Sequence, residues 1–216
     1  MKDKKYILIL LAVVLCLCSS ARSDIINGGF ETGDLSGWTY SGTVGTVTDE
    51  YARDFLGLVQ PPLDGFWYPT EGSYFASLWS TDIVGTEDVS TLSQTFTSNA
   101  GLLLQFDYFF DFGDVAPYYD WSLCTLSWTG SSVTLFEYNT SGHELNDDEN
   151  IGWTRILYTL PATNTYMLEF TTADGVEPGY ESILGIDNVQ IVPAPGAVLL
   201  GMLGLSVAGV KLRKHA

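Results

Sequence analysis

Carboxylates and aromatic rings alternate between residues 107 and 121. Four aspartates, Asp107, Asp111, Asp114 and Asp120, stand among the rings of Tyr108, Phe109, Phe110, Phe112, Tyr118, Tyr119 and Trp121. Hydrolysis of a glycosidic bond needs two carboxyl groups a few ångströms apart, one of them with a raised pKa. Aromatic faces can instead stack on a sugar whose hydroxyls bond to the carboxylates. The same composition also arises from core strands that end in a solvated acidic loop, so all three interpretations stay open.

Catalysis by histidine, cysteine or a bound zinc ion has few candidate residues in this sequence. Between residues 24 and 192, His143 is the only histidine and Cys124 the only cysteine. His143-Glu144 begins like a zinc-protease motif, but Asp147 stands where the second histidine must be. There is no Gly-x-Ser-x-Gly elbow. Because Cys124 lies in an apolar, strand-like run, we expect a buried small hydrophobe there and no catalytic thiol.

An aromatic tetrapeptide, Phe66-Trp67-Tyr68-Pro69, stands apart from these residues. It is open to two interpretations, an exposed binding tip or a loop that packs on the edge of the domain. Aromatic side chains suit both, since they bury a large area and also bind ligands through their faces.

Charge excludes one class of partner. Between residues 24 and 192 the basic side chains are Arg53 and Arg155, against 25 carboxylates, which gives a formal charge of −23. Nucleic acid is excluded, because binding its phosphates depends on lysine and arginine. Cations suit this surface, and the charge also keeps an exposed protein soluble.

Short alternating segments predict the scaffold that positions these residues. Leu102, Leu104, Phe106, Tyr108 and Phe110 form one apolar face of a strand. Further strands are predicted at 38–48, 74–79, 89–97, 121–128, 133–136, 153–160, 166–171 and 183–192, separated by turn residues. No helical stripe or internal repeat is found in this region. The sequence therefore predicts an all-β fold, a single antiparallel β-sandwich of the jelly-roll kind at residues 24–192.

The first residues have the layout of a secretory signal peptide. Lys2, Lys4 and Lys5 precede an apolar run from Tyr6 to Cys18, and small residues follow. We expect a signal helix within residues 1–23, with cleavage after Ala21 or Ser23. Lipidation at Cys18 is disfavoured, because Leu17 occupies the preceding position, where a small residue is expected.

The last residues repeat the pattern in reverse. Pro193-Ala194-Pro195 precedes an uncharged apolar segment, 196–210, and a basic end, Lys211-Leu212-Arg213-Lys214-His215. This layout resembles the PEP-CTERM sorting signal of Gram-negative bacteria, although Ala194 stands where that family has glutamate. The resemblance implies a membrane protease of the exosortase type as partner and delivery to the cell surface. An ordinary C-terminal transmembrane anchor has the same topology. Both basic ends are expected in the cytoplasm, with residues 24–192 outside.

The two ends of the predicted sandwich carry a second resemblance. Asn27-Gly28-Gly29-Phe30-Glu31 begins a motif that runs to Trp38, and Ile186-Asp187-Asn188-Val189-Gln190-Ile191 closes the domain. The pair resembles the first and last strands of carbohydrate-binding-module jelly rolls, the galactose-binding-like sandwiches. That resemblance implies a structural calcium ion at Glu31 and Asp187, with carbonyl groups near Gly29 or Gly33. Alternatively, Glu31 bonds turn amides and Asp187 only ends a strand.

These observations favour a non-enzymatic binding or scaffolding protein of the cell surface or extracellular matrix. A carbohydrate-binding module with a specific glycan ligand is the main alternative, and surface glycans or exopolysaccharide would be its partners. A secreted enzyme acting on glycans ranks third.

Overall fold

The computed structural model describes residues 25–51, 66–80, 89–112, 120–139, 150–175 and 181–194. The predicted signal peptide and the hydrophobic segment 196–210 lie outside these ranges, and so do Arg53, Asp114, Tyr118, Tyr119 and His143. Within the described ranges, the structure has no helix with the length and apolarity of a membrane span.

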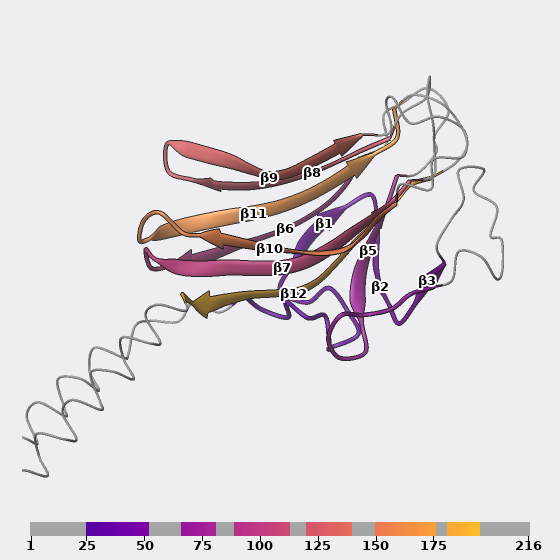
Figure 1. Ribbon diagram of the computed structural model, residues 1–216, viewed down its shortest axis with the longest axis horizontal. Helices are drawn as coiled ribbons and strands as arrows, with labels where there is room; N and C mark the ends of the chain where they lie inside the picture. The colour runs from indigo at the N-terminus through magenta and orange to yellow at the C-terminus, as the bar shows by residue number, and fades with distance from the viewer. Residues whose placement is uncertain are drawn as a thin grey trace, which may run out of the picture.

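Two five-stranded antiparallel sheets pack face to face, which confirms the predicted β-sandwich (Figure 1). The first sheet has the order β1 (Thr39–Ser41), β6 (Val89–Ser98), β11 (Asn164–Ala173), β8 (Trp121–Trp128) and β9 (Ser131–Asn139). The second sheet has the order β10 (Ile151–Thr159), β7 (Leu102–Asp111), β12 (Ile183–Pro193), β5 (Phe75–Trp79) and β2 (Thr43–Val47). A short pair, β3 (Glu50–Tyr51) with β4 (Phe66–Trp67), forms a third, two-stranded sheet.

The core lies between the two large sheets. Because side chains alternate along a strand, Leu104, Phe106, Tyr108 and Phe110 of β7 all point into the sandwich, where each is at most 1% exposed. Cys124 of β8 is fully buried in the same cluster, as the apolar run around it predicted.

A second apolar cluster lies on the outer face of the second sheet. Phe75, Phe109 and Ile183 are fully buried there, and Trp67 and Trp153 pack against them. Gly185 allows this arrangement, because a Cβ atom on it would stand 1.9 Å from Cε1 of Phe109. On its other side, the Phe109 ring stacks on Trp67 at a centroid distance of 4.5 Å and an interplanar angle of 13°. The β3–β4 pair therefore packs on the outer face of the second sheet through Trp67.

The structure corrects two details of the predicted strand pattern. The opening segment, 27–38, was expected to be the first strand, but it is a series of turns. It does lie beside the last strand, since the amide of Val189 donates to the carbonyl of Gly28 at 2.9 Å. The strand predicted at 38–48 is two strands, β1 and β2. Gly42 has a φ of +77° between them, and the chain changes sheet at this residue.

Candidate functional site

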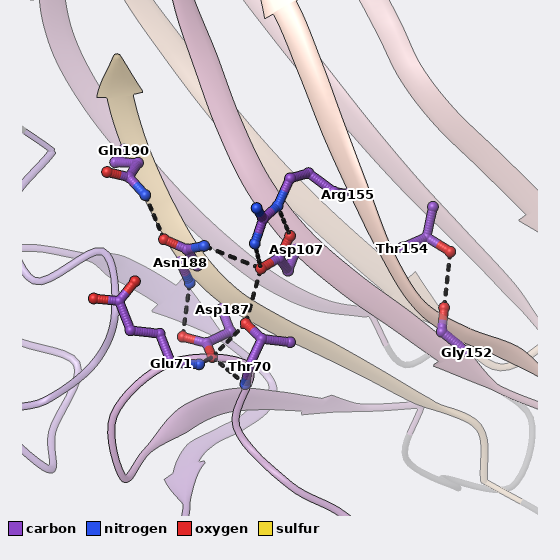
Figure 2. A network of polar contacts seen from close by, with 9 residues as sticks. All are labelled: Thr70, Glu71, Asp107, Gly152, Thr154, Arg155, Asp187, Asn188 and Gln190. Carbon is purple, nitrogen blue, oxygen red and sulfur yellow. Dashed lines mark hydrogen bonds and ion pairs between the residues drawn. The ribbon is translucent and has the colours of Figure 1, made fainter.

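Asp107 and Arg155 form a charged pair on the outer face of the second sheet. They are register partners on β7 and β10. Nε of Arg155 donates to one carboxylate oxygen of Asp107 at 2.6 Å, and Nη2 donates to the other at 2.7 Å (Figure 2). The Asp107 side chain is 4% exposed, whereas that of Arg155 is 51% exposed. A buried carboxylate therefore holds a half-exposed guanidinium in one orientation.

Asp187 lies opposite Asp107 on the neighbouring strand β12 and is fully buried. Its Oδ2 accepts hydrogen bonds from the amides of Thr70 and Glu71 at 2.7 and 3.0 Å, and its Oδ1 accepts one from the amide of Asn188. The Thr70 hydroxyl lies 2.9 Å from Oδ2 of Asp187 and 2.8 Å from Oδ2 of Asp107. It has one hydrogen, so at any moment it donates to one of the two carboxylates.

The pKa values of the two aspartates move in opposite directions. For Asp187, burial is the largest influence and raises the pKa, and its hydrogen bonds to Glu71 and Thr70 offset only part of that effect. For Asp107, burial also raises the pKa, but the hydrogen bonds from Arg155, Asn188 and Thr70 and the charge of Arg155 together outweigh it. The net result is a lowered pKa for Asp107.

A break in the register of β12 adds amide groups to this network. The pairing of β12 with β7 shifts between Asp187 and Gln190, and Asn188 has a φ of +55°. Asparagine adopts this left-handed conformation more readily than most residues do. Asn188 donates to Asp107 at 3.1 Å, and Gln190 donates to the side-chain carbonyl of Asn188. Gln190, Asn188, Asp107 and Arg155 therefore form one connected row, called here the polar row (Figure 2).

The segment that carries the aromatic tetrapeptide is held at two points. Nε1 of Trp67 donates to Asp111 at 2.6 Å while its ring stacks on Phe109. Three residues later, Thr70 binds both buried aspartates. Phe66 and Tyr68 flank Trp67, and they are 38% and 59% exposed. Their ring centroids are 5.9 Å apart at an interplanar angle of 35°. Trp67 packs on the edge of the domain, as one interpretation of the tetrapeptide expected, and its two neighbours are exposed, while a binding role stays a prediction.

The two predicted calcium ligands bind the same segment of chain at its opposite ends. Oε1 of Glu31 accepts the amides of Ser73 and Tyr74 at 2.8 and 3.0 Å, while Asp187 binds Thr70 and Glu71. The turn amides expected in the alternative interpretation are therefore present at Glu31. Among the residues that the structure describes, no group of three or more histidine, cysteine or acidic side chains is arranged to hold a metal. The calcium ion at Glu31 and Asp187 stays a prediction.

The acidic–aromatic run is divided between separate places. Asp107 and Asp111 lie on the outer face of the second sheet, where they bind Arg155 and Trp67. Asp120 is fully buried elsewhere, and its Oδ2 accepts the Ser80 hydroxyl at 3.0 Å and the Ser182 amide at 2.9 Å. The rings of Tyr108, Phe110 and Phe112 belong to the core.

Sequence reasoning missed the residues that complete the site, Thr70, Asn188 and Arg155. Arg155 carried a usable signal, because an arginine in a strand of a strongly acidic domain must find a carboxylate. Thr70 carried none, since its role depends on a contact 117 residues away along the chain.

No protein-family model and no curated protein matches the chain. Among solved structures, TmCBM61 in complex with β-1,4-galactotriose has a TM-score of 0.46 and 19% identity, over 81% of this chain and 100% of that one. CBM28, described as a carbohydrate-binding module specific for non-crystalline cellulose, has a TM-score of 0.46 and 14% identity, over 81% and 97%. A cyclase from Fischerella sp. TAU has a TM-score of 0.44 and 12% identity, over 79% and 96%. None of these likenesses assigns a ligand to this chain.

Proposed function

We propose that this chain is an exported surface protein whose β-sandwich is a non-catalytic module that binds a glycan. The observation that carries the proposal is the position of the Arg155 guanidinium. Asp107 binds one edge of it on the sheet side, through Nε and Nη2, and 51% of the side chain is exposed to solvent. Nη1 adds two further N–H donors, for which no hydrogen-bond acceptor is found among the residues that the structure describes.

Sugar hydroxyls suit such a surface, because specificity in small-ligand sites comes from a few well-placed polar groups. The polar row supplies them. Its guanidinium is oriented before a ligand arrives, so binding costs little side-chain entropy at this position. The resemblance of the opening and closing motifs to carbohydrate-binding modules points to the same class of ligand.

Glycan hydrolysis is the second candidate, and one observation favours it. Asp107 and Asp187 are neighbours whose pKa values are shifted apart, as an acid and its partner carboxylate require. The side chains are nevertheless closed to a substrate, since that of Asp107 is 4% exposed and Asp187 is fully buried. The Thr70 hydroxyl occupies the position between them. Binding without catalysis therefore has the stronger support.

The ends of the chain supply the cellular part of the proposal. Residues 1–23 direct export, and residues 193–216 act as a sorting tail for an exosortase-type membrane protease. The module then reaches the surface, the outer envelope or the extracellular matrix of a Gram-negative bacterium. Exopolysaccharide or another surface glycan is its partner there, and the basic residues after Val210 hold the tail in the membrane before processing.

A glycan-binding screen of the purified protein tests the proposed function. We expect binding to at least one glycan without release of reducing ends. Arg155→Lys keeps the charge but loses the two-pronged geometry, so affinity should fall about tenfold. The melting temperature of the variant is measured alongside, to separate lost binding from lost folding. A wild-type protein that binds no glycan contradicts the proposal, and hydrolysis abolished by Asp187→Asn establishes the second candidate.

A further inference from the structure

Phe66 and Tyr68 present two rings to solvent from one side of the β4 segment. Residues two apart in an extended chain point to the same side, and the 5.9 Å ring separation shows that these two do. Large exposed hydrophobic side chains are few among the described residues, and two of them stand here in contact. Within this tetrapeptide, Trp67 is the ring that packs on the outer face of the second sheet.

The segment beneath these rings is anchored to the second sheet at both of its ends. Trp67 is anchored by Phe109 and Asp111, and Thr70 and Glu71 by Asp187. All of these partners are buried. A binding surface that is ordered before its ligand arrives gives up less conformational entropy on binding.

The two rings also lie close to the polar row. Tyr68 is two residues before Thr70, a distance of at most about 7 Å along the backbone. The Thr70 hydroxyl is 2.8 Å from Asp107, and Asp107 is 2.7 Å from Nη2 of Arg155. A ligand a few sugar units long can span both features.

We infer that Phe66 and Tyr68 form the stacking subsite of the glycan site, and that its ligand is a neutral pyranose oligosaccharide. The inference rests on the proposed function. The C–H face of a pyranose packs on an aromatic ring while its hydroxyls bond to the polar row. The formal charge of −23 between residues 24 and 192 disfavours a glycan that carries carboxylates. The same charge opposes a second copy of this chain as the occupant.

Calorimetry on the purified chain tests this subsite, with β-1,4-galactotriose and cellotriose as neutral probes and trigalacturonate as the acidic probe. Tyr40→Ala is the matched control, because Tyr40 is 55% exposed on β1 of the opposite sheet. We expect wild type and Tyr40→Ala to bind a neutral probe equally. The double variant Phe66→Ala/Tyr68→Ala should bind it at least about tenfold more weakly, with an unchanged melting temperature.

Each other outcome overturns a distinct statement. If the double variant retains wild-type affinity, the stacking subsite is wrong and the proposed glycan-binding function stands. If trigalacturonate binds more tightly than the neutral probes, the assignment of a neutral ligand is wrong. If wild type binds none of the three and no glycan in the wider screen, the proposed function fails and the subsite fails with it. If wild type is dimeric in sedimentation and the double variant monomeric, the rings serve self-association instead.

Discussion

Asp107 and Asp187 stand opposite each other on adjacent strands and share one hydroxyl, yet the pKa of the first is lowered and that of the second raised. Burial raises the pKa of both, but at Asp107 the hydrogen bonds from Arg155, Asn188 and Thr70 and the charge of Arg155 outweigh it, whereas at Asp187 burial remains the larger influence. Arg155 donates hydrogen bonds to Asp107 through Nε and Nη2, and Asp187 accepts hydrogen bonds from Thr70, Glu71 and Asn188. One carboxylate therefore anchors the exposed guanidinium, and the other anchors the loop that bears the aromatic pair.

The raised pKa of Asp187 predicts a specific pH dependence of stability. A carboxyl whose pKa is higher in the folded state stabilises the fold below its unfolded pKa of about 3.9, and that contribution is lost as pH rises through the folded pKa. Asparagine cannot ionise, so Asp187→Asn should lose less stability than wild type between pH 4 and pH 7. Urea unfolding at each pH gives the free energy of unfolding of both proteins, from which this loss is calculated. Asp49→Asn, at an exposed position, is the control and should follow wild type.

Trp67 should contribute to stability through two separable interactions. Trp67→Phe keeps a ring against Phe109 but removes the bond to Asp111, and should cost about 1–3 kcal/mol. Trp67→Ala also removes the stacked ring and should cost about 3 kcal/mol or more. Urea denaturation gives both values. Equal values for the two variants would show that the stacked ring contributes nothing.

Glu31 offers a test of the predicted calcium ion. Glu31→Gln keeps an oxygen for the amides of Ser73 and Tyr74 but removes one of the two negative charges that would attract the cation, and with it a carboxylate that can bind the cation through both oxygens. If calcium binds, the melting temperature of wild type rises with calcium and falls with chelator, by mass action. Both Glu31→Gln and Asp187→Ala should then lose this response. A wild-type midpoint that is identical in calcium and in chelator rules the site out.

Cys124 should behave as a buried hydrophobe and not as a reactive thiol. Burial, followed by the charge of Glu169, raises its pKa well above the ordinary value, so little thiolate forms near neutral pH. A thiol reagent should label the native protein slowly and the urea-unfolded protein at once. Cys124→Ser places a hydroxyl in the core and should cost about 1–3 kcal/mol. Cys124→Ala, which adds no polar group, should cost less.

The charged ends of the sequence predict a membrane topology that reporter fusions can test. Alkaline phosphatase fused after Val192 should be active, because that residue is expected outside the inner membrane. The same enzyme fused after Ala216 should be inactive. Activity at both positions would contradict the sorting-tail interpretation.

Much of the fold could be predicted from alternation of apolar residues. The run Trp121–Trp128 was predicted with its observed bounds as β8, and β7 and β12 differ by one residue each. Alternation could not show the change of sheet at Gly42, because apolar and polar positions continue through it. The site was harder to predict, since Asp107 and Asp187 meet through sheet register and Thr70 reaches them through a long-range contact. Secondary-structure propensity and local residue spacing carry no information on sheet register or on long-range contacts.

The position of β12 has a consequence for the order in which the molecule can form. It is the last strand of the described chain, yet it lies in the middle of the second sheet, between β7 and β5. A chain that emerges N-terminus first during synthesis has β5 and β7 available before residue 183, where β12 begins, has emerged. Until then the buried faces of β5 and β7 and the edges that will pair with β12 are open to aggregation. The second sheet can therefore be completed only after almost all of the described chain has been synthesised.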